Sequence, residues 1–414
     1  MYRLPFNDIR VLDLTMAWAG PYATRLLADM GAEVIKIEAV NNWDLLRTFT
    51  GQPPDVERVW DKSPYFNHTN RNKYGCSLDL SQPDGRDLFL RLVEVSDVVI
   101  ENFRAEVMDN LRLTYDLLAA RNDQLIMLSM PGHGKTGPER DFIAYGTNVE
   151  QLSGLCHLTG YIGGPPQKTG ISYGDPMAGI AAAGAIALAL WDRRRTGRGQ
   201  YIELAQRENL INVIGEFVVA FSMNQRESLR RGNRHSSMAP HGCYPCDGDD
   251  QWITIACETD AQFAALCLVI AQPHLTRDQR FADVVSRYRN QDPLDAIIAV
   301  WSRGRTKEET TASLQAAGVP AMPVLSVPEV FADEHLRARG FFESVSHPVA
   351  GISEIEAPHW RMSETPAHIR LPAPSFAEHN NYVFRDLMGL SDEEIAQLEG
   401  DGITGPAPNW AVHE

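Results

Sequence analysis

A single acidic residue, Asp175, lies where the sequence offers both a reactive group and room for a large ligand. It follows Gly174 and precedes Pro176, and small residues such as Ala178 and Gly179 come next. A carboxylate in such a place can act as a nucleophile if water is kept away from it. The same carboxylate can instead cap a helix, because Asp accepts backbone N–H groups and Pro suits the first helical position. By local sequence alone, the capping role is favoured.

The residues after Asp175 form an apolar run from Met177 to Trp191, followed by three arginines and a glycine-containing turn. The run is about fifteen residues long, too short for a membrane span, which needs roughly twenty. It therefore predicts a helix that is buried on all sides within a globular protein. A strand at 201–204 and a second apolar helix at 209–223 are expected to follow.

Composition and charge narrow the class of protein. A chain of 414 residues exceeds the usual size of one domain, so two or three domains are expected. The net charge of −16 argues against nucleic acid or an anionic membrane as the main partner. The six cysteines do not resemble a disulfide framework, and the Cys243/Cys246 pair lacks the further ligands of a metal site. The N-terminus lacks the order of a signal peptide, so a cytoplasmic enzyme without a bound metal is expected.

The N-terminal third alternates between strand-like and helix-like patterns. Two strands with a helix between them form a β-α-β unit, which is typical of a parallel sheet with helices packed on it. The polar segment 42–63 is expected to form a loop over the surface. The predicted strands are 9–15, 33–37, 97–100 and 125–130, and the predicted helices are 21–30 and 85–95.

Two nucleotide-binding motifs are excluded by their missing residues. The turn after the first strand has one glycine, Gly20, where a dinucleotide-binding turn has three, so no nicotinamide cofactor is expected. The segment Gly134-Lys135-Thr136 resembles a phosphate-binding loop, but Ser129 replaces its first glycine and Gly137-Pro138 replaces the helix that should follow. By contrast, Asn102 and Phe103 directly follow a predicted strand, where open α/β sheets bind ligands.

A charged segment at 226–234 marks the first expected domain boundary. Beyond it, 243–256 has the pattern of a β-hairpin around an Asp-Gly-Asp-Asp turn. Near the C-terminus, Ser391 and Glu394 have the spacing of a capping box at a helix start. The intervening region predicts a small α+β domain with helices at 261–271, 294–301 and 306–317.

Sequence motifs along nearly the whole chain resemble the class III coenzyme A transferase family, which includes the formyl-CoA, carnitine and benzylsuccinate CoA-transferases. The resemblance implies a large Rossmann-like α/β domain built from both chain ends, 1–225 and 326–414, with a small α+β domain at 226–325. It also implies two interlaced chains. The motifs are, in order, VLDLT, AGP, LLADMGAEVIKIE, NRNK, VVIENF, the Gly-Asp step with RRRTGRGQYIEL, APHGCYPC, QWITIA, AGVPAMPV and LMGLSDEEI.

In this family the aspartate of the Gly-Asp step is the nucleophile, and Asp175 matches it. The resemblance implies that Asp175 attacks an acyl-CoA and then carries CoA as an aspartyl thioester. By the same carry-over, the residues that line the CoA site are Ala17, Trp18, Lys73, Asn102 and Phe103, with Lys73 meeting a phosphate. Ala39, Tyr74 and Asn110 stand at positions where the family often has basic residues, so Arg71 and Arg104 are candidate replacements for the phosphate contacts.

Oxyanion and substrate contacts are expected from the glycine-rich loop that ends at Gly174 and from the His241-Gly242 turn. Tyr145 is a further candidate, because it occupies the position where the 2-methylacyl-CoA racemases of the same family place a catalytic histidine. A phenol with an ordinary pKa of about 10 is a poor base near neutrality, so transfer is favoured over racemisation.

The expected function is transfer of CoA from an acyl-CoA, with succinyl-CoA as a donor by family habit, to a carboxylic acid. Coenzyme A enters as a substrate, and no permanently bound cofactor is expected. The alternatives are a racemase or isomerase of the same family and a non-catalytic acyl-CoA-binding subunit of a heteromeric transferase. The expected assembly is an interlocked homodimer, or a heteromer with a related subunit.

Overall fold

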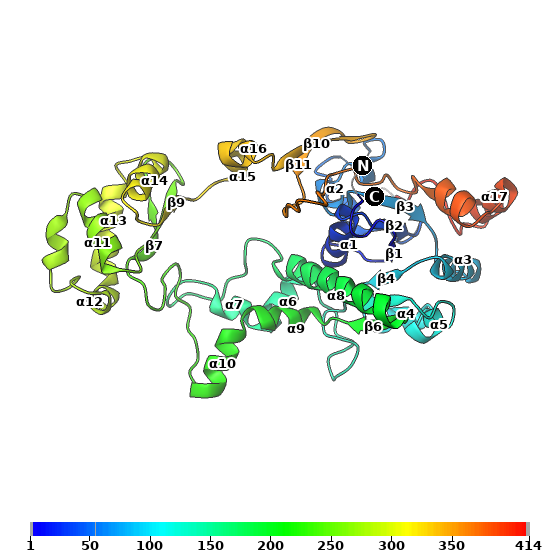
Figure 1. Ribbon diagram of the computed structural model, residues 1–414, viewed down its shortest axis with the longest axis horizontal. Coiled ribbons are helices and arrows are strands. Elements are labelled where there is room, and N and C mark those ends of the chain that lie inside the picture. Colours follow the sequence, from blue (N-terminus) through cyan, green and yellow to red (C-terminus); the bar gives the residue numbers. More distant parts are fainter. Residues whose placement is uncertain (1–2, 54, 411–414) are drawn as a thin grey trace. The chain divides into compact units, whose positions relative to one another are not determined.

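The computed structural model describes residues 3–53 and 55–410, which form two compact units (Figure 1). The first unit comprises the described residues of 1–156, 168–226 and 337–414. The second unit comprises 157–167 and 227–336. Chain segments that are distant in sequence therefore build the first unit together.

Six parallel strands form the sheet of the first unit within the described residues, in the order β3-β2-β1-β4-β5-β6. This confirms the predicted parallel α/β sheet. The strand order reverses between β1 and β4, and in such sheets the carboxyl ends of those two strands flank the ligand-binding crevice. The strands are β1 (Arg10–Asp13), β2 (Glu33–Glu38), β3 (Lys73–Ser77), β4 (Val98–Glu101), β5 (Ile126–Ser129) and β6 (Gln200–Glu203).

Helices cover both faces of this sheet, because successive strand side chains point to opposite sides. Val11 and Val98 pack with α1 (Ala19–Asp29) and α8 (Gly174–Thr196). Their neighbours Leu12 and Val99 pack on the other face with α3 (Pro83–Glu94). The C-terminal segment joins this second face through Phe384 and Ile395, the latter from α17 (Asp392–Gly400). The Ser391–Glu394 capping box at the start of α17 is present as predicted.

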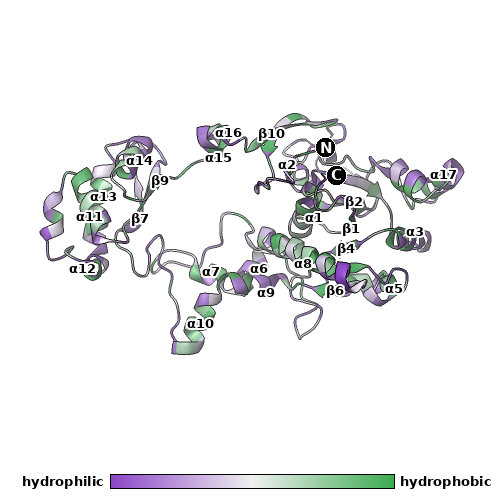
Figure 2. Cartoon of the chain, in the orientation of Figure 1, coloured by the Kyte–Doolittle hydropathy of each residue, from purple (hydrophilic) through white to green (hydrophobic). Residues whose placement is uncertain are grey.

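Helix α8 differs from the prediction in length and burial. It has 23 residues, and among the described residues it is the one helix long and apolar enough to cross a membrane by length and composition. It packs against α1, so one side belongs to the core of the first unit. The prediction of burial on all sides is wrong, because Ile180, Leu188 and Trp191 are exposed. Figure 2 shows the hydropathy of the residues along α8.

The second apolar helix, predicted at 209–223, is divided in the structure. It consists of α9 (Gln206–Val213) and α10 (Gly215–Asn224), separated at Ile214. None of the residues of α10 is buried, although the helix is rich in apolar side chains. Val219, Phe221 and Met223 are more than half exposed, at 55%, 52% and 75%.

The segment 42–63 is only in part the surface loop that its polarity predicts, because many of its described residues are exposed but several charged ones are not. Asp44, Arg47 and Asp61 are fully buried. The Arg47 guanidinium donates to Glu38 at 2.7 Å and to Asp61 at 2.9 Å, which draws the segment onto the sheet. A polar sequence misleads here because paired charges can be buried where their hydrogen bonds are satisfied.

The second unit has a three-stranded antiparallel sheet, β7 (His241–Pro245), β8 (Trp252–Ala256) and β9 (Ala321–Pro323). The predicted hairpin is thus confirmed as β7–β8. Helices α11 (Asp260–Val269), α13 (Gln291–Ser302) and α14 (Lys307–Ala316) supply its core with Phe263, Ile298 and Leu314. The remaining elements are η1 (Leu45–Thr48), η2 (Val59–Asp61), α2 (Pro64–Asn70), α4 (Val107–Asn110), α5 (Tyr115–Ala119), α6 (Gly146–Ser153), α7 (Leu155–Leu158), η3 (Pro273–Arg277), α12 (Val284–Arg289), α15 (Val327–Ala332), α16 (Glu334–Ala338), β10 (Phe342–His347), β11 (Gly351–Glu356) and η4 (Tyr382–Leu387).

Candidate active site

The loops after β1 and β4 meet at the switch point of the sheet. The side-chain amide of Asn102 accepts from Met16 N at 2.8 Å and donates to Met16 O at 2.7 Å. The next residue, Ala17, has a left-handed backbone with φ of 62°, and its N–H donates to Asp44 at 3.0 Å. Asn102 therefore holds the loop that carries Ala17 and Trp18, two of the predicted CoA-site residues.

A buried cluster of alternating charges supports this loop. Lys36 donates to Asp44 at 2.8 Å and also to the backbone oxygen of Thr15. Lys73 lies 3.0 Å from Asp13, and all four charged side chains are fully buried. Burial alone would raise the pKa of Asp13, but the charges of Lys73 and Lys36 outweigh it and lower that pKa. The cluster is balanced, two cations against two anions.

The place of Lys73 requires a correction to its predicted role. Its ammonium has three donors, which are directed to Asp13 at 3.0 Å, the Pro21 carbonyl at 3.0 Å and Asn70 Oδ1 at 2.7 Å. No N–H donor of Lys73 is left for a CoA phosphate. Lys73 instead stabilises the turn between β1 and α1 through these hydrogen bonds. Arg71 is likewise buried and bound to Asp29 and Glu356, which removes it as a replacement phosphate ligand.

The other predicted CoA-site residues lie on the accessible side of the switch point. Trp18 is half-buried, packs edge-on against Tyr65 with ring centroids 6.1 Å apart, and has a buried indole N–H without a partner in the described residues. Phe103 is half-buried and donates its backbone N–H to Glu101 at 2.8 Å. Arg104 is 52% exposed and pairs with Glu106 at 3.3 Å, which leaves it accessible to an anion.

Asp175 is the second residue of α8, and its carboxylate does not cap the helix. The N-cap position is Tyr173, which has no side-chain cap bond. The acceptor at this helix end is Glu150 of α6, which receives the N–H of Tyr173 and, at 3.4 Å, the N–H of Gly174. The predicted capping role of Asp175 is therefore wrong. Gly174 directs its N–H to Glu150, so it is also unsuited to be an oxyanion donor.

The start of α6 touches the Asp175 carboxylate. A Cβ on Gly146, the first residue of α6, would lie 1.9 Å from Asp175 Oδ2, so this position has no room for a side chain. The N–H groups in the first turn of a helix have no partners within the helix and favour negative charge. Tyr145 immediately precedes Gly146 and is 67% exposed, which makes its phenol accessible to a ligand.

The surroundings of Asp175 disfavour its negative charge. Burial, together with the negative charge of Glu150, raises the pKa of Asp175 to about 7. A carboxylate with a raised pKa is a stronger nucleophile once ionised, and a perturbed group of this kind is typical of reaction centres.

Helix packing places Asp175 on the side of the switch point. Gly179 lies one turn after Asp175, and a Cβ there would be 2.7 Å from the Ala19 carbonyl at the start of α1. Residues four apart share a helix face, so Asp175 faces the same way as Gly179. Because Ala19 directly follows Trp18, the Asp175 carboxylate and the predicted CoA-site loop belong to one region of the first unit.

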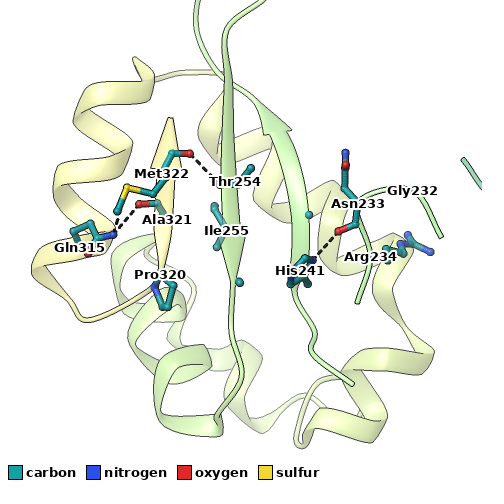
Figure 3. A pocket seen from close by; sticks show the side chains of 12 residues that line it. Gly232, Asn233, Arg234, His241, Thr254, Ile255, Gln315, Pro320, Ala321 and Met322 are labelled. Carbon is teal, nitrogen blue, oxygen red and sulfur yellow. Dashed lines mark hydrogen bonds between the residues drawn. The ribbon is translucent and has the colours of Figure 1, made fainter. Parts of the chain in front are cut away.

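His241 and Gly242 belong to the second unit and line a cavity of about 490 Å³ over the β7–β8–β9 sheet (Figure 3). His241 Nδ1 lies 2.7 Å from the Asn233 carbonyl, so this nitrogen carries the proton. The nearby Arg234 is paired with Asp292 and Asp295. The predicted oxyanion and substrate roles of His241 and Gly242 stay predictions.

Two residues of the site, Gly146 and Glu150, are absent from the sequence-based prediction. They are four positions apart, which puts them on one face of a single helix turn. A buried glutamate in such a short helix is unusual, since unpaired Glu is rarely buried. The spacing is visible in the sequence, but what Glu150 binds depends on the fold.

Comparisons with known proteins agree with this arrangement. The family model described as CoA-transferase family III matches residues 6–380. The succinyl-CoA–D-citramalate CoA-transferase of Chloroflexus aurantiacus is 33% identical over 399 residues, covering 96% of this chain and 98% of that protein. The alpha subunit of the succinyl-CoA–L-malate CoA-transferase of the same organism is 33% identical over 406 residues, covering 97% and 93%.

A solved CAIB/BAIF family protein from Brucella suis superposes with a TM-score of 0.84 at 32% identity, covering 93% of this chain and all of that one. Its likeness extends over the parallel sheet and the helices that carry the candidate site. The chain belongs to CoA-transferase family III.

Proposed function

We propose that this enzyme moves CoA from an acyl-CoA to a free carboxylic acid through a covalent intermediate on Asp175. The observation that carries the proposal is a partly buried carboxylate, with its pKa raised to about 7, at a position where the neighbouring helix has a glycine. A neutral-pH nucleophile that must avoid water needs both properties.

The reaction consists of four exchanges that balance without an external proton. An Asp175 oxygen bonds to the acyl carbon of the donor, the C–S bond breaks, and CoA leaves as thiolate. The thiolate attacks the Asp175 carbonyl carbon of the mixed anhydride, and the donor acid leaves as carboxylate. The acceptor carboxylate then attacks the aspartyl thioester and releases the thiolate again. Finally the thiolate attacks the acceptor acyl carbon, which restores the Asp175 carboxylate and yields the acceptor CoA ester.

The first-unit residues have distinct roles in this proposal. Ala17, Trp18, Phe103 and Arg104 contact the CoA moiety, while Asn102 and Lys73 hold the loop that presents it. The N–H groups at the start of α6 stabilise negative charge that develops next to Asp175. Partial burial of Asp175 limits the access of water to the anhydrides.

Succinyl-CoA is the proposed donor, and a small dicarboxylic acid is the proposed acceptor. The support comes from the relatives, whose names give succinyl-CoA as the donor and D-citramalate or L-malate as the acceptor. The acid that this chain accepts is best identified by a panel of dicarboxylic acids, each tested for exchange with succinyl-CoA.

The proposed assembly is an interlaced, cytoplasmic dimer with a large domain from 1–225 and 326–414 and a small domain at 226–325. The support is the exposed apolar face of α8 and the wholly unburied α10, which together expose more apolar surface than an isolated protomer usually does. A heteromer is the alternative, because the malate relative is named as an alpha subunit. Size measurement of the purified chain, alone, distinguishes the two.

The test of the function is trapping of the intermediate. The protein is incubated with succinyl-CoA and hydroxylamine, digested, and analysed by tandem mass spectrometry for a hydroxamate at Asp175. The matched control is Asp175→Asn, which has the same size and no nucleophilic oxygen anion. A hydroxamate in the wild type and none in the variant supports the proposal. Wild-type turnover by Asp175→Asn would overturn it, and α-proton exchange into deuterated water without CoA transfer would indicate a racemase.

A further inference from the structure

Glu150 has a fully buried carboxylate, and its hydrogen-bond partners lie in the chain segment just before Asp175. It accepts the Thr169 hydroxyl at 3.1–3.2 Å and the backbone N–H groups of Tyr173 and Gly174. These partners span the segment that enters α8. Glu150 therefore fixes the helix start one residue before Asp175 and takes over the cap that Asp175 would otherwise provide.

The Glu150 carboxylate is buried, the Asp175 carboxylate is partly buried, and no cation is among the influences on the pKa of Asp175. Besides burial, the charge of Glu150 is the influence that acts on Asp175. The nearby ionisable groups are Cys156, whose Sγ lies 4.0 Å from Glu150, and Lys168, whose charge acts on that thiol. From α9 the helix start is met by the apolar side chain of Leu210, and from α6 by the glycine at position 146. Within the described residues, then, Asp175 faces one anion and no compensating cation.

From this geometry we infer that Glu150 is a positioning residue that also drives formation of the covalent intermediate by repelling the ionised form of Asp175. The inference rests on the proposed function and assigns a further residue to the same site. When Asp175 attacks, its oxygen becomes part of a neutral anhydride, and the negative charge leaves on the CoA thiolate. In the second exchange the charge leaves on the donor carboxylate. Each adduct thus relieves the repulsion between the charges of Glu150 and Asp175.

This reasoning links two measurable quantities. Protonation and acylation both remove the charge of Asp175, so a neighbour that disfavours the charge promotes both to a similar extent. If removing the Glu150 charge moves the acidic limb of the activity profile by about one pH unit, the equilibrium between free enzyme and adduct should change about tenfold. A purely structural Glu150 would produce no such agreement.

The test compares the wild type with Glu150→Gln, which keeps the acceptor oxygen and removes the charge. The acidic limb of kcat/KM is expected to move to lower pH by about one unit. At pH 8.5, the ratio of CoA adduct to free enzyme at a fixed ratio of succinyl-CoA to succinate, read by intact-protein mass spectrometry, is expected to fall about tenfold. Thr169→Val is the matched control, because it removes a hydroxyl that lies 3.1–3.2 Å from Glu150 and 2.6 Å from the Ile171 carbonyl but leaves the Glu150 charge, so its pH limb should stay in place.

Glu150→Met, of similar size and without charge, serves as a second variant if Glu150→Gln does not fold. An unchanged pH limb and an unchanged adduct ratio in a folded charge-free variant would overturn the inference while the proposed function stands. An absence of any adduct in the wild type would overturn both. A shifted limb without a change in the adduct ratio would also refute the inference, because the two effects share one cause.

Discussion

The first unit has two clusters of charge, one fully buried and one partly buried, that differ in the signs of their members. At the end of β1, Lys36 and Lys73 face Asp13 and Asp44, and every anion has a cation within 3.0 Å. At the start of α8, Asp175 faces Glu150 and no cation acts on it among the described groups. The pKa of Asp13 is lowered by its lysines, whereas that of Asp175 is raised by burial and by Glu150.

The difference separates charged residues that support the fold from charged residues that are proposed to take part in the reaction. In the balanced cluster, the lysine charges lower the pKa of Asp13, while burial lowers the pKa of Lys73 to about 8, and the cluster holds the loop that it underlies. In the like-charged pair, the charge of Asp175 is disfavoured, and in the proposed function a proton or an acyl group removes it. Buried ionisable residues in this protein can therefore be sorted by the sign of their neighbours, and substitutions in the two clusters should fail in different ways.

The largest expected effect is on turnover, from Asp175→Asn. Loss of the nucleophile should lower kcat by about 10³-fold or more, measured by CoA exchange. The same substitution should increase the stability of the folded protein above neutral pH. Because the folded pKa lies above the unfolded one, ionisation of Asp175 removes stability as pH rises from about 4 to about 7. The variant should therefore melt at least about 2 °C above the wild type at pH 8 and close to it at pH 4. A lower melting temperature at pH 8 would contradict the like-charge account.

Substitutions in the balanced cluster should lower the free energy of unfolding. Lys73→Met leaves Asp13 buried without its nearest cation, which should cost about 3–5 kcal/mol of unfolding free energy in urea titrations. The double variant Asp13→Leu with Lys73→Met should recover part of this loss, because it leaves no unpaired charge. If Lys73→Met instead kept full stability and raised KM for acyl-CoA, the direct phosphate contact predicted from the sequence would be restored.

The contact between α6 and the nucleophile can be tested with one methyl group. Gly146→Ala puts a Cβ where Asp175 Oδ2 now lies, so the carboxylate must move and kcat should fall about 10-fold to 100-fold. Gly400→Ala at the end of α17, where a Cβ meets nothing within 4 Å, is the control and should retain activity. Equal kcat values of the two variants would show that turnover does not depend on the present position of the Asp175 carboxylate.

The smallest effect is expected at the exposed cation. Arg104→Ala should raise KM for acyl-CoA about 2-fold to 5-fold with little change in kcat, because exposed charge pairs contribute little. The difference should shrink in high salt, where the charge is screened. Arg121→Ala, which removes a similarly exposed arginine paired with Glu94, is the matched control and should leave KM unchanged.

The sequence predicts the sheet well because its signals are local. The β-branched runs around Val11 and Val98 and the helix pattern before Gly31 depend on neighbours within one element. The capping box at Ser391 is local in the same sense. The role of Lys73 is different, because the sequence records a cation but not the three oxygen acceptors that bind it in the fold. Its three partners come from β1, α1 and α2.

The candidate site divides in the same way. Asp175 is found from a short motif, whereas its relation to Glu150 requires α6 and α8 to be folded together. The capping prediction fails for this reason: an aspartate before a proline is a good cap locally, but a residue 25 positions earlier takes the bonds. The segment 42–63 shows the same limit, since its polarity is real and its burial depends on Arg47 reaching Glu38.

The unburied helix α10 has a consequence for how the protein must be made. A helix of ten residues is too short to hold its shape in water without packing, and none of its side chains is buried within the chain. A newly synthesised chain therefore exposes an apolar, incompletely helical segment until another protein surface packs against it. Expression yield should depend on how quickly that cover is found, and polar substitutions at Phe221 or Met223 should leave the chain soluble at low concentration but unable to mature.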